Sequence, residues 1–454
     1  MTNWIKNAIF YHIYPLGACG APRTNNFNLL PSNRLSLIHT WLDHIQSLGA
    51  NALYLGPLFE SSTHGYDTAN YYEIDRRLGT RKDLQVLSQD LHDRGMHLVL
   101  DGVFNHVGRE FWAFKDVLVK GQDSPYRDWF YNLRFDGHSP YDDPFSYEAW
   151  NGHYSLVKLN LDNPQVLEHL FGAIQMWVEE FGIGGIRLDA ADSLSFSFLK
   201  KLGAFCHHRW ADFWLMGEVI HGDYRQWVDS SRLDSVTNYE LYKGLYSSHN
   251  DKNYFELAYT LNRQFGQDGI YKDKLLYNFA DNHDINRIAS QLTNPANLYQ
   301  LHLLLYTIPG IPSIYYGSEF GIPGRKTKGD DNPLRPIFDL PALLSVSPQP
   351  DLPDFIRCLA KIRNSSPALQ QGAYTQHLVT PQIFAFSRSF GDETIVVVTN
   401  SSDDTQKVSL HLPEFANASL QDLLAYEESF DISEGKVDLS VSPNWGHILR
   451  VIHT

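Results

Sequence analysis

Short apolar runs rich in β-branched and aromatic residues alternate with longer amphipathic segments over the first three-quarters of the chain. Runs of this kind, bounded by turn residues, predict buried strands. The sequence predicts eight of them, at 8–14, 51–55, 97–101, 185–189, 213–217, 235–238, 275–279 and 312–316. The segments between them repeat their apolar positions every three or four residues and predict helices, as at 36–50, 84–96 and 165–182.

Repeated alternation of strand and helix predicts a (β/α)₈ TIM barrel of parallel strands. A doubly wound sheet is the competing topology, because it alternates the same elements. The connection between the third and fourth strands, 102–184, is far longer than a normal loop. Within it, 12 of the 40 residues in 111–150 are aromatic. This composition indicates an inserted subdomain over the mouth of the barrel.

After about Pro367 the helical pattern stops, and the runs TIVVVTN, KVSLHL and GHILRVIHT show the alternation of strands. They predict a small C-terminal antiparallel β-sandwich domain. We therefore expect four segments: the first part of the barrel (1–106), an inserted domain B (107–160), the second part of the barrel (161–366) and the C-terminal β domain (367–454).

The 454-residue chain is 43% hydrophobic and 20% charged, which is typical of a folded globular protein. Its net charge of −15 disfavours nucleic acids and anionic membrane surfaces as partners. Cys19, Cys206 and Cys358 lie far apart and form neither a disulfide framework nor a zinc motif. The first residues show no signal-peptide pattern, and glycine and prolines break the most apolar stretch, 301–316. We expect a cytoplasmic protein with no membrane association.

Polar residues gather where the predicted strands end, which is where the active sites of such barrels lie. The strand ends read DGVFNH (101–106), GIRLDAAD (185–192), GEVIH (217–221) and FADNHD (279–284). Carboxylates recur on all four, together with imidazoles and an arginine. A metal site, a proton-transfer site or a glycosidase site can each be built from such a set.

Taken singly, these residues also have structural interpretations. Asp101, Asp192 and Asp281 are expected to be structural or to lie outside direct substrate contact. Each imidazole fits a structural histidine as well as a ligand contact. Arg187 and Asp189 are two residues apart and share one face of a strand, so that the guanidinium would keep the carboxylate ionised, as a nucleophile requires.

In combination and in this order, the four motifs resemble the conserved regions of the α-amylase superfamily (glycoside hydrolase family 13). The segments GYDTANYYEID (65–75), RLGTRKDLQVLSQDLHDRGMHLVLD (77–101) and YYGSEFG (315–321) are similar to further parts of that family. The resemblance extends from Tyr11 to about Gly372 and implies the same barrel with a C-terminal β domain.

The resemblance implies a role for each matching residue. Asp189 would be the nucleophile that forms a covalent glucosyl-enzyme intermediate, and Glu218 would act first as general acid and then as general base. Asp284 would bind sugar hydroxyls and stabilise the oxocarbenium-like transition state. The residues expected to bind substrate or to orient these groups are Tyr66, Asp67, His106, Arg187, His221, His283 and Arg335.

A narrower resemblance points to the neopullulanase and cyclomaltodextrinase group. LVKLN (156–160) is similar to a fifth region of that group, and Glu218 is followed by Val-Ile-His, as in its GEIWH-like segment. Enzymes of the group cut α-1,4 bonds in cyclodextrins, pullulan and short maltodextrins, and some also cut α-1,6 bonds. We therefore expect a retaining hydrolase of short or cyclic maltodextrins. A cytoplasmic α-amylase, an α-glucanotransferase and a hydrolase of a mixed-linkage cyclic maltosyl tetrasaccharide remain alternatives.

Two departures from the group change the expectation. Its members usually carry an N-terminal β domain that shapes a dimer, whereas here the first barrel strand begins near residue 8. Any oligomer is therefore expected to form without such a domain. Asp192-Ser193 stands where extracellular α-amylases usually have Lys-His, and the loop GACGAPRTNNF lacks an acidic calcium motif. We expect an oligosaccharide substrate and no metal or other cofactor.

Two other classes of protein make different predictions. A catalytically inactive barrel used as a sugar-binding module would lack one of Asp189, Glu218 and Asp284 and would carry a membrane anchor. A metal-dependent barrel hydrolase would lose its reaction in EDTA. The sequence retains all three carboxylates, which favours the glycosidase.

Overall fold

Eight parallel strands form the centre of the computed structural model, which describes residues 4–337, 339–425 and 427–453. They are β1 (Phe10–Ile13), β2 (Ala52–Leu55), β5 (His97–Gly102), β9 (Gly185–Leu188), β10 (Trp214–Gly217), β11 (Ser235–Val236), β12 (Tyr277–Phe279) and β13 (Ile311–Tyr315). The sheet order is β11-β10-β9-β5-β2-β1-β13-β12, and a parallel bridge between Thr237 and Tyr277 joins its two edges. The sheet is thus a barrel and not a doubly wound sheet. All eight predicted strands are confirmed to within two residues at each end.

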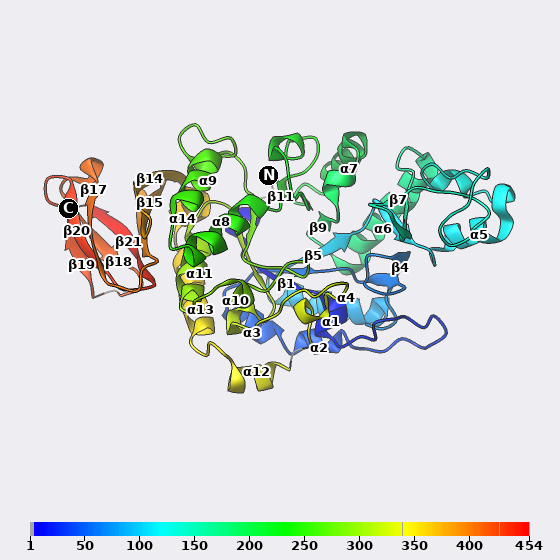
Figure 1. The fold of residues 1–454 in the computed structure, drawn as a ribbon, viewed down its shortest axis with the longest axis horizontal. Helices are drawn as coiled ribbons and strands as arrows, with labels where there is room; N and C mark the ends of the chain where they lie inside the picture. Colours follow the sequence, from blue (N-terminus) through cyan, green and yellow to red (C-terminus); the bar gives the residue numbers. More distant parts are fainter. Residues whose placement is uncertain (1–3, 338, 426, 454) are drawn as a thin grey trace.

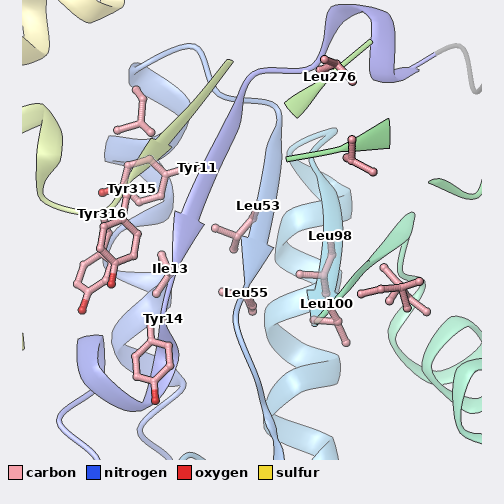
Figure 2. Packing of buried hydrophobic residues seen from close by; sticks show 14 of the residues in the cluster. Tyr11, Ile13, Tyr14, Leu53, Leu55, Leu98, Leu100, Leu276, Tyr315 and Tyr316 are labelled. Atoms are coloured by element: carbon pink, nitrogen blue, oxygen red, sulfur yellow. The ribbon is translucent and has the colours of Figure 1, made fainter. Parts of the chain in front are cut away.

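The strands are buried on both faces because alternate residues point into two different cores. Tyr11, Leu53 and Leu98 are partners across β1, β2 and β5, and one step further along are Ile13, Leu55 and Leu100 (Figure 2). Both rows pack against residues of the surrounding helices. Residues at the alternate positions of the barrel strands fill the interior, in a separate cluster that includes Phe10, Ala52, Tyr54, Val99, Trp214, Met216, Tyr277, Phe279 and Ile311. This double burial explains why the strands appear in the sequence as continuous apolar runs.

The helices that accompany the strands are α1 (Pro15–Ala18), α2 (Ser36–His39), α3 (Leu42–Ser47), α4 (Arg81–Asp93), α6 (Pro164–Phe181), α7 (Phe196–Arg209), α8 (Tyr239–Asn250), α9 (Phe255–Phe265), α10 (Ile288–Gln291), α11 (Asn297–Thr307), α12 (Leu340–Val346) and α13 (Leu352–Asn364). The single helix predicted at 36–50 is divided into α2 and α3. At the break, the Thr40 hydroxyl donates to the carbonyl of Leu37, a local bond that competes with the helical ladder. Among the described residues, no helix combines the length and the apolar character that crossing a membrane requires.

The helices predicted at 84–96 and 165–182 correspond to α4 and α6, and local signals at the helix ends explain why. Thr80 and Asp83 form a capping box at the start of α4, in which each side chain bonds the other's backbone N–H. The helix α6 begins with Pro164 and ends at Gly182, whose φ of 57° lies in the left-handed region that glycine adopts readily. Single-turn 3₁₀ helices lie at Trp4–Asn7, Gly121–Asp123, Arg127–Trp129, Ala191–Ser193, Tyr224–Gln226, Ser318–Phe320, Asn332–Leu334 and Pro413–Phe415.

An inserted unit follows β5, and in Figure 1 it lies at the opposite end of the long axis from the C-terminal sheets. It contains β6 (His106–Gly108), α5 (Trp112–Lys120), β7 (Ala149–Trp150) and β8 (His153–Lys158), with the strands in the order β6-β8-β7. Most of its aromatic residues form its own small core. Phe114, for example, packs edge to face on Phe130, Phe145 and Tyr147. A hairpin of β3 (Phe59–Ser61) and β4 (Thr68–Ile74) follows β2.

The C-terminal domain begins after the short helix α14 (Pro367–Gln371). One antiparallel sheet contains β14 (Ala373–Val379), β15 (Ile383–Phe390), β16 (Glu393–Asn400), β21 (Trp445–His453), β18 (Ala418–Asp422) and β19 (Ser429–Asp431), and the other pairs β17 (Gln406–His411) with β20 (Lys436–Val441). In β16, Val396 and Val398 belong to the core between the two sheets, whereas Ile395 and Val397 belong to the core shared with the barrel. The predicted antiparallel domain is therefore confirmed.

A buried ion pair makes the stability of this domain depend on pH. Nδ1 of His447 lies 2.5 Å from Oδ2 of Asp422, and Nε2 lies 3.3 Å from the carbonyl oxygen of Ser440. Burial disfavours the charged imidazole, but the hydrogen bond and the charge of Asp422 outweigh it and raise the pKa of His447 above its ordinary value. Such a group stabilises the fold below its unfolded pKa, about 6.5, and the stabilisation is lost as pH rises through the folded pKa.

We expect His447→Gln to lower the melting temperature markedly at pH 6 and much less at pH 9. At the lower pH the variant loses a charge-assisted hydrogen bond worth about 2 kcal/mol. Differential scanning calorimetry at the two pH values measures the difference. His411→Gln, at an exposed position of the same domain, is the control. It should leave the melting temperature unchanged at both pH values. An equal loss for His447→Gln at both pH values would contradict the prediction.

Candidate active site

A cavity of about 900 Å³ opens where the carboxyl ends of the barrel strands meet. Three carboxylates from three strand ends line it: Asp189 after β9, Glu218 after β10 and Asp284 after β12. The predicted substrate-binding residues that also line it are Tyr66, His106 and Arg335. Residues far apart in the sequence thus share one surface because parallel strands of a barrel end on the same side.

Arg187 is buried beneath this surface and contacts three carboxylates. Its Nη1 lies 2.9 Å from Oδ1 of Asp101 and 3.0 Å from Oδ1 of Asp189, and its Nη2 lies 2.8 Å from Oε2 of Glu218. It reaches all three because β5, β9 and β10 are neighbours, with Asp101 directly opposite Arg187 in the sheet. Charge-assisted bonds to a planar guanidinium restrict the orientation of each carboxylate. Arg187 therefore fixes Asp189 and Glu218 relative to each other.

The chain turns sharply directly after Asp189. Ala190 has φ 45° and ψ 46°, a left-handed conformation that costs a residue with a Cβ atom about 1–2 kcal/mol. The turn directs the backbone N–H of Ala190 toward Oε2 of Glu218, at 3.2 Å. Backbone strain at this position therefore supplies a hydrogen-bond donor inside the site, as strained residues at functional sites often do.

The carboxyls of the site differ in how readily they ionise. Burial raises the pKa of the Asp189 carboxyl well above its ordinary value; Arg187 opposes the rise, and the nearby charge of Glu218 adds to it. Burial acts in the same direction on Asp284, but His283 and then Arg335 outweigh it and lower the pKa of that carboxyl. Asp284 therefore remains ionised beside His283 and Arg335.

Aromatic and imidazole rings hold Asp284 in place. Tyr66 and Tyr14 each stack on the His283 ring, with interplanar angles of 12° and 14°. Nε2 of His283 lies 2.9 Å from Oδ2 of Asp284, and it also bonds the Tyr66 hydroxyl. Nη2 of Arg335 lies 2.7 Å from Oδ1 of Asp284. His283 is thus buried behind the cavity, where it positions Asp284 and Tyr66.

His106 lines the cavity, and its Nε2 is a buried hydrogen-bond donor. Burial lowers the pKa of its imidazole to about 3, so the ring is neutral at physiological pH. The amide nitrogen of Asn105 lies 3.2 Å from Nδ1 of His106. An amide N–H donating to Nδ1 leaves the ring proton on Nε2. That Nε2 has no hydrogen-bond partner among the described residues and lies 3.9 Å from Oδ2 of Asp189.

Four of the seven predicted residues do not line the cavity: Arg187 and His283 lie behind it and orient its carboxylates, and Asp67 and His221 point elsewhere. Asp67 is buried, and its Oδ2 accepts a 2.7 Å hydrogen bond from the hydroxyl of Thr63. His221 is exposed, although its neighbour Ile220 does line the cavity. Both lie next to a residue that lines the cavity, and proximity in sequence alone did not reveal which way their side chains point.

Several residues of the cavity were not predicted as site residues. The unpredicted lining residues with polar or aromatic side chains include His64, Trp150, His153, Asp192, Tyr239, Lys326 and Asp331. Tyr239 carries a signal that could have found it, because it directly follows the predicted strand 235–238 and therefore stands at a strand end. Lys326 and Asp331 lie in an irregular loop after β13, where neither periodicity nor spacing places a side chain.

The described residues contain one group of side chains that lie close enough together to bind a metal ion, and it is in the C-terminal domain. The group consists of Asp422, Glu428 and His447. Both ring nitrogens of His447 are already hydrogen-bonded, which fits a protonated imidazole rather than a metal ligand. That the reaction needs no cofactor stays a prediction.

Known proteins share both domains of the chain. Residues 34–340 match the model of the family "Alpha amylase, catalytic domain", and residues 377–444 match "Maltogenic Amylase, C-terminal domain". A cyclomaltodextrinase of a Bacillus species is 32% identical over 88% of this chain and 73% of its own length. Neopullulanase 2 of Thermoactinomyces vulgaris is 29% identical over 98% of this chain and 78% of its own.

A solved structure matches the chain over its whole length. The cyclic α-maltosyl-(1→6)-maltose hydrolase of Arthrobacter globiformis superposes with a TM-score of 0.82 at 26% identity, covering 99% of each chain. The catalytic-family match covers more than half of the chain and contains Asp189, Glu218 and Asp284. The chain therefore belongs to the α-amylase family and is an α-glucan-active glycosidase.

Proposed function

We propose that the protein is a retaining glycoside hydrolase that cleaves α-1,4-glucosidic bonds in short or cyclic maltodextrins. The observation that carries this proposal is that Asp189 and Glu218 enter one cavity from adjacent strands and share Arg187, with Asp284 in the same cavity. Retaining enzymes need two carboxyl groups about 5–5.5 Å apart, one to attack and one to transfer protons. Adjacent strand ends supply such a pair.

The reaction proceeds in two steps at this site. In the first, Glu218 donates a proton to the glycosidic oxygen as the bond from that oxygen to C1 breaks and Asp189 bonds to C1. In the second, Glu218 takes a proton from water as the water oxygen bonds to C1 and the bond to Asp189 breaks. Asp284, which remains ionised, stabilises the positive charge that develops on the sugar ring in both steps.

The other polar groups of the cavity bind the sugar. The Nε2–H of His106 and the guanidinium of Arg335 are positioned to donate to sugar hydroxyls, and the Tyr66 ring offers a flat face for stacking. Arg187 and His283 act from behind the cavity by orienting the carboxylates. Because they lie outside the cavity lining, Asp67 and His221 are not proposed as direct contacts.

The choice of short or cyclic maltodextrins rests on the relatives and on the size of the cavity. A cavity of about 900 Å³ holds a ligand of a few glucose rings. The cyclomaltodextrinase and neopullulanase relatives are named for cyclic maltodextrins and for pullulan. The relative that matches over its full length hydrolyses a cyclic sugar with (1→6) linkages, which favours hydrolysis of such a mixed-linkage cyclic sugar as a second candidate function.

A product profile tests these proposals. The enzyme is incubated with β-cyclodextrin, maltotriose, pullulan, panose, soluble starch and cyclic α-maltosyl-(1→6)-maltose, and the products are separated by chromatography. We expect fast conversion of the cyclic and short α-1,4 substrates and little action on starch. Preferential attack on starch would identify an α-amylase, and products longer than the substrate at high concentration would identify an α-glucanotransferase. Preference for the (1→6)-linked cyclic sugar would establish the second candidate.

The stereochemistry of the first product tests the mechanism separately. Proton NMR recorded within the first turnovers should show the α-anomer, because two inversions at C1 restore the configuration. Initial release of the β-anomer would exclude a covalent intermediate. The Glu218→Gln variant, purified in the same way, controls for contaminating glycosidases in both experiments.

The insert contributes one residue whose removal should change substrate preference. Trp150 lines the cavity, and its ring lies near those of His106 and His153, at centroid distances of 5.5 and 5.8 Å. We expect Trp150→Ala to raise KM for β-cyclodextrin roughly tenfold, in line with the loss of an aromatic contact worth about 1.5 kcal/mol, and to change kcat for maltotriose little.

The matched control is Trp112→Ala, which removes a partly exposed tryptophan of the same insert that does not line the cavity. It should leave KM for β-cyclodextrin unchanged. If both variants raise KM equally, or if Trp150→Ala changes only the melting temperature, Trp150 supports the insert and does not bind substrate.

A further inference from the structure

The two oxygens of the Glu218 carboxyl have different surroundings. Oε2 faces two donors that cannot accept a proton, Nη2 of Arg187 at 2.8 Å and the backbone N–H of Ala190 at 3.2 Å. Oε1 has one hydrogen-bond partner among the described residues, the hydroxyl of Tyr239 at 3.3 Å. A proton on Oε2 would point at one of these two N–H groups, and neither can accept a hydrogen bond from it. The transferable proton of Glu218 therefore belongs on Oε1.

Tyr239 is held firmly at this oxygen. It is the first residue of α8, and its ring packs edge to face on Phe279 of β12, with centroids 4.9 Å apart. Its hydroxyl oxygen lies 3.1 Å from the amide nitrogen of Asn282. The amide oxygen of Asn282 accepts a 2.8 Å hydrogen bond from the backbone N–H of Asp284, which fixes the orientation of the amide. Asn282 therefore donates to Tyr239, and the proton of Tyr239 is free to point at Glu218.

The Tyr239 hydroxyl can serve both protonation states of Glu218. A phenolic oxygen has one proton and two lone pairs, and the amide of Asn282 uses only one lone pair. When Oε1 is ionised, the Tyr239 hydroxyl donates a hydrogen bond to it. When Oε1 carries a proton, the second lone pair of the Tyr239 oxygen can accept a hydrogen bond from that proton. Burial and then the charge of Glu218 raise the pKa of the Tyr239 hydroxyl well above its ordinary value, so the hydroxyl keeps its proton throughout.

We propose that Tyr239 is a positioning residue that holds Oε1 of Glu218 toward the substrate in both halves of the reaction. This inference rests on the proposed function, in which Glu218 alternates between acid and base. During bond cleavage the proton leaves Oε1 for the glycosidic oxygen, and Tyr239 then donates to the carboxylate that remains. During hydrolysis Oε1 takes a proton from the attacking water, and Tyr239 accepts from the restored acid. Tyr239 itself gives up no proton.

The test compares two substrates that differ in their need for an acid. Maltotriose has a sugar leaving group that must be protonated, whereas α-maltosyl fluoride releases fluoride without protonation by an acid. We expect Tyr239→Phe to lower kcat/KM for maltotriose at least tenfold, the lower end of the effect of a hydrogen bond to a charged group. For the fluoride we expect a change of less than about twofold, because kcat/KM reports only the steps up to the covalent intermediate and acid assistance is not needed there.

A matched control is available on the same helix. Tyr242 lies one turn after Tyr239, stacks on the same Phe279 ring at 17°, and does not line the cavity. Tyr242→Phe removes the same atom from the same aromatic cluster and should leave kcat/KM unchanged for both substrates. Glu218→Gln should show the same preference for the fluoride as Tyr239→Phe, but to a greater extent.

Each outcome decides the proposal. An equal loss on both substrates, or a loss that Tyr242→Phe shares, would show that the Tyr239 hydroxyl only supports the structure. An unchanged kcat/KM for maltotriose would show that Oε1 needs no positioning. Either result would overturn the inference. The proposed function would still stand, provided that the wild-type enzyme acts on both substrates. A wild-type enzyme that acts on neither substrate would instead overturn the proposed function, and the inference with it.

Discussion

Glu218→Gln should reduce kcat for maltotriose by about 10²- to 10⁴-fold, the usual contribution of a positioned general acid. The amide has the shape of the carboxyl but no proton to transfer. Its oxygen can accept from Arg187 and the N–H of Ala190, and its NH₂ can donate to Tyr239, so the side chain keeps its place. Substrate binding, measured by isothermal titration calorimetry, should therefore be nearly unchanged, as should the melting temperature.

Two measurements distinguish a missing acid from a disturbed site. For Glu218→Gln, kcat/KM for α-maltosyl fluoride should fall far less than kcat/KM for maltotriose, because kcat/KM does not include the hydrolysis step in which Glu218 acts as base. Glu148→Gln, at an ion pair with Lys158 outside the cavity, should retain wild-type activity on both. If Glu218→Gln remained within tenfold of the wild type on maltotriose, another group would supply the proton and the assignment of Glu218 would be wrong.

Asp189→Asn should abolish the covalent intermediate together with the activity. An amide does not form the bond to C1 that Asp189 is proposed to form, and the loss should amount to several orders of magnitude in kcat. Arg187 keeps Asp101 and Glu218 as partners in this variant, so the folded structure should persist. Mass spectrometry after incubation with a fluorinated maltosyl fluoride should show one covalent label on the wild type and none on Asp189→Asn.

Asp192→Asn provides the comparison for this experiment. Asp192 is also a carboxylate at the cavity, three residues further along the chain, but it is exposed and makes no contact with Arg187. Its variant should accept the label as the wild type does. Peptide mapping identifies the labelled side chain; a label on Asp192, Asp284 or any residue other than Asp189 would identify a different nucleophile.

The prediction of the barrel succeeded because its signals are local. Each strand is buried on both faces and therefore appears as a continuous apolar run, and each helix repeats its buried positions every three or four residues. Capping residues such as Thr80 and Gly182 mark helix ends within a few positions. The segment 36–50 shows the limit of this reasoning, because one hydroxyl, that of Thr40, accompanies a break that periodicity does not register.

The aromatic residues of the insert show a second limit. Their number indicated an inserted subdomain but did not place the rings, and in the structure Phe114 packs on Phe130 and Phe145 inside the insert. Trp150 is among the aromatic residues of 111–150 and does line the cavity. Composition counts residues but does not distinguish a buried ring from one at the surface of a site.

By itself, the sequence determined that eight strands would alternate with helices, and that carboxylates would stand at the ends of several of them. From strand ends on one side of a barrel it follows that Asp189, Glu218 and Asp284 are near one another. Only the tertiary structure decided that Arg187 contacts three carboxylates, that Ala190 is left-handed and directs its N–H at Glu218, and that Tyr239 meets Oε1. The physical reason is that periodicity and caps act within a few residues, whereas these contacts join atoms from separate strands and depend on the register and closure of the whole barrel.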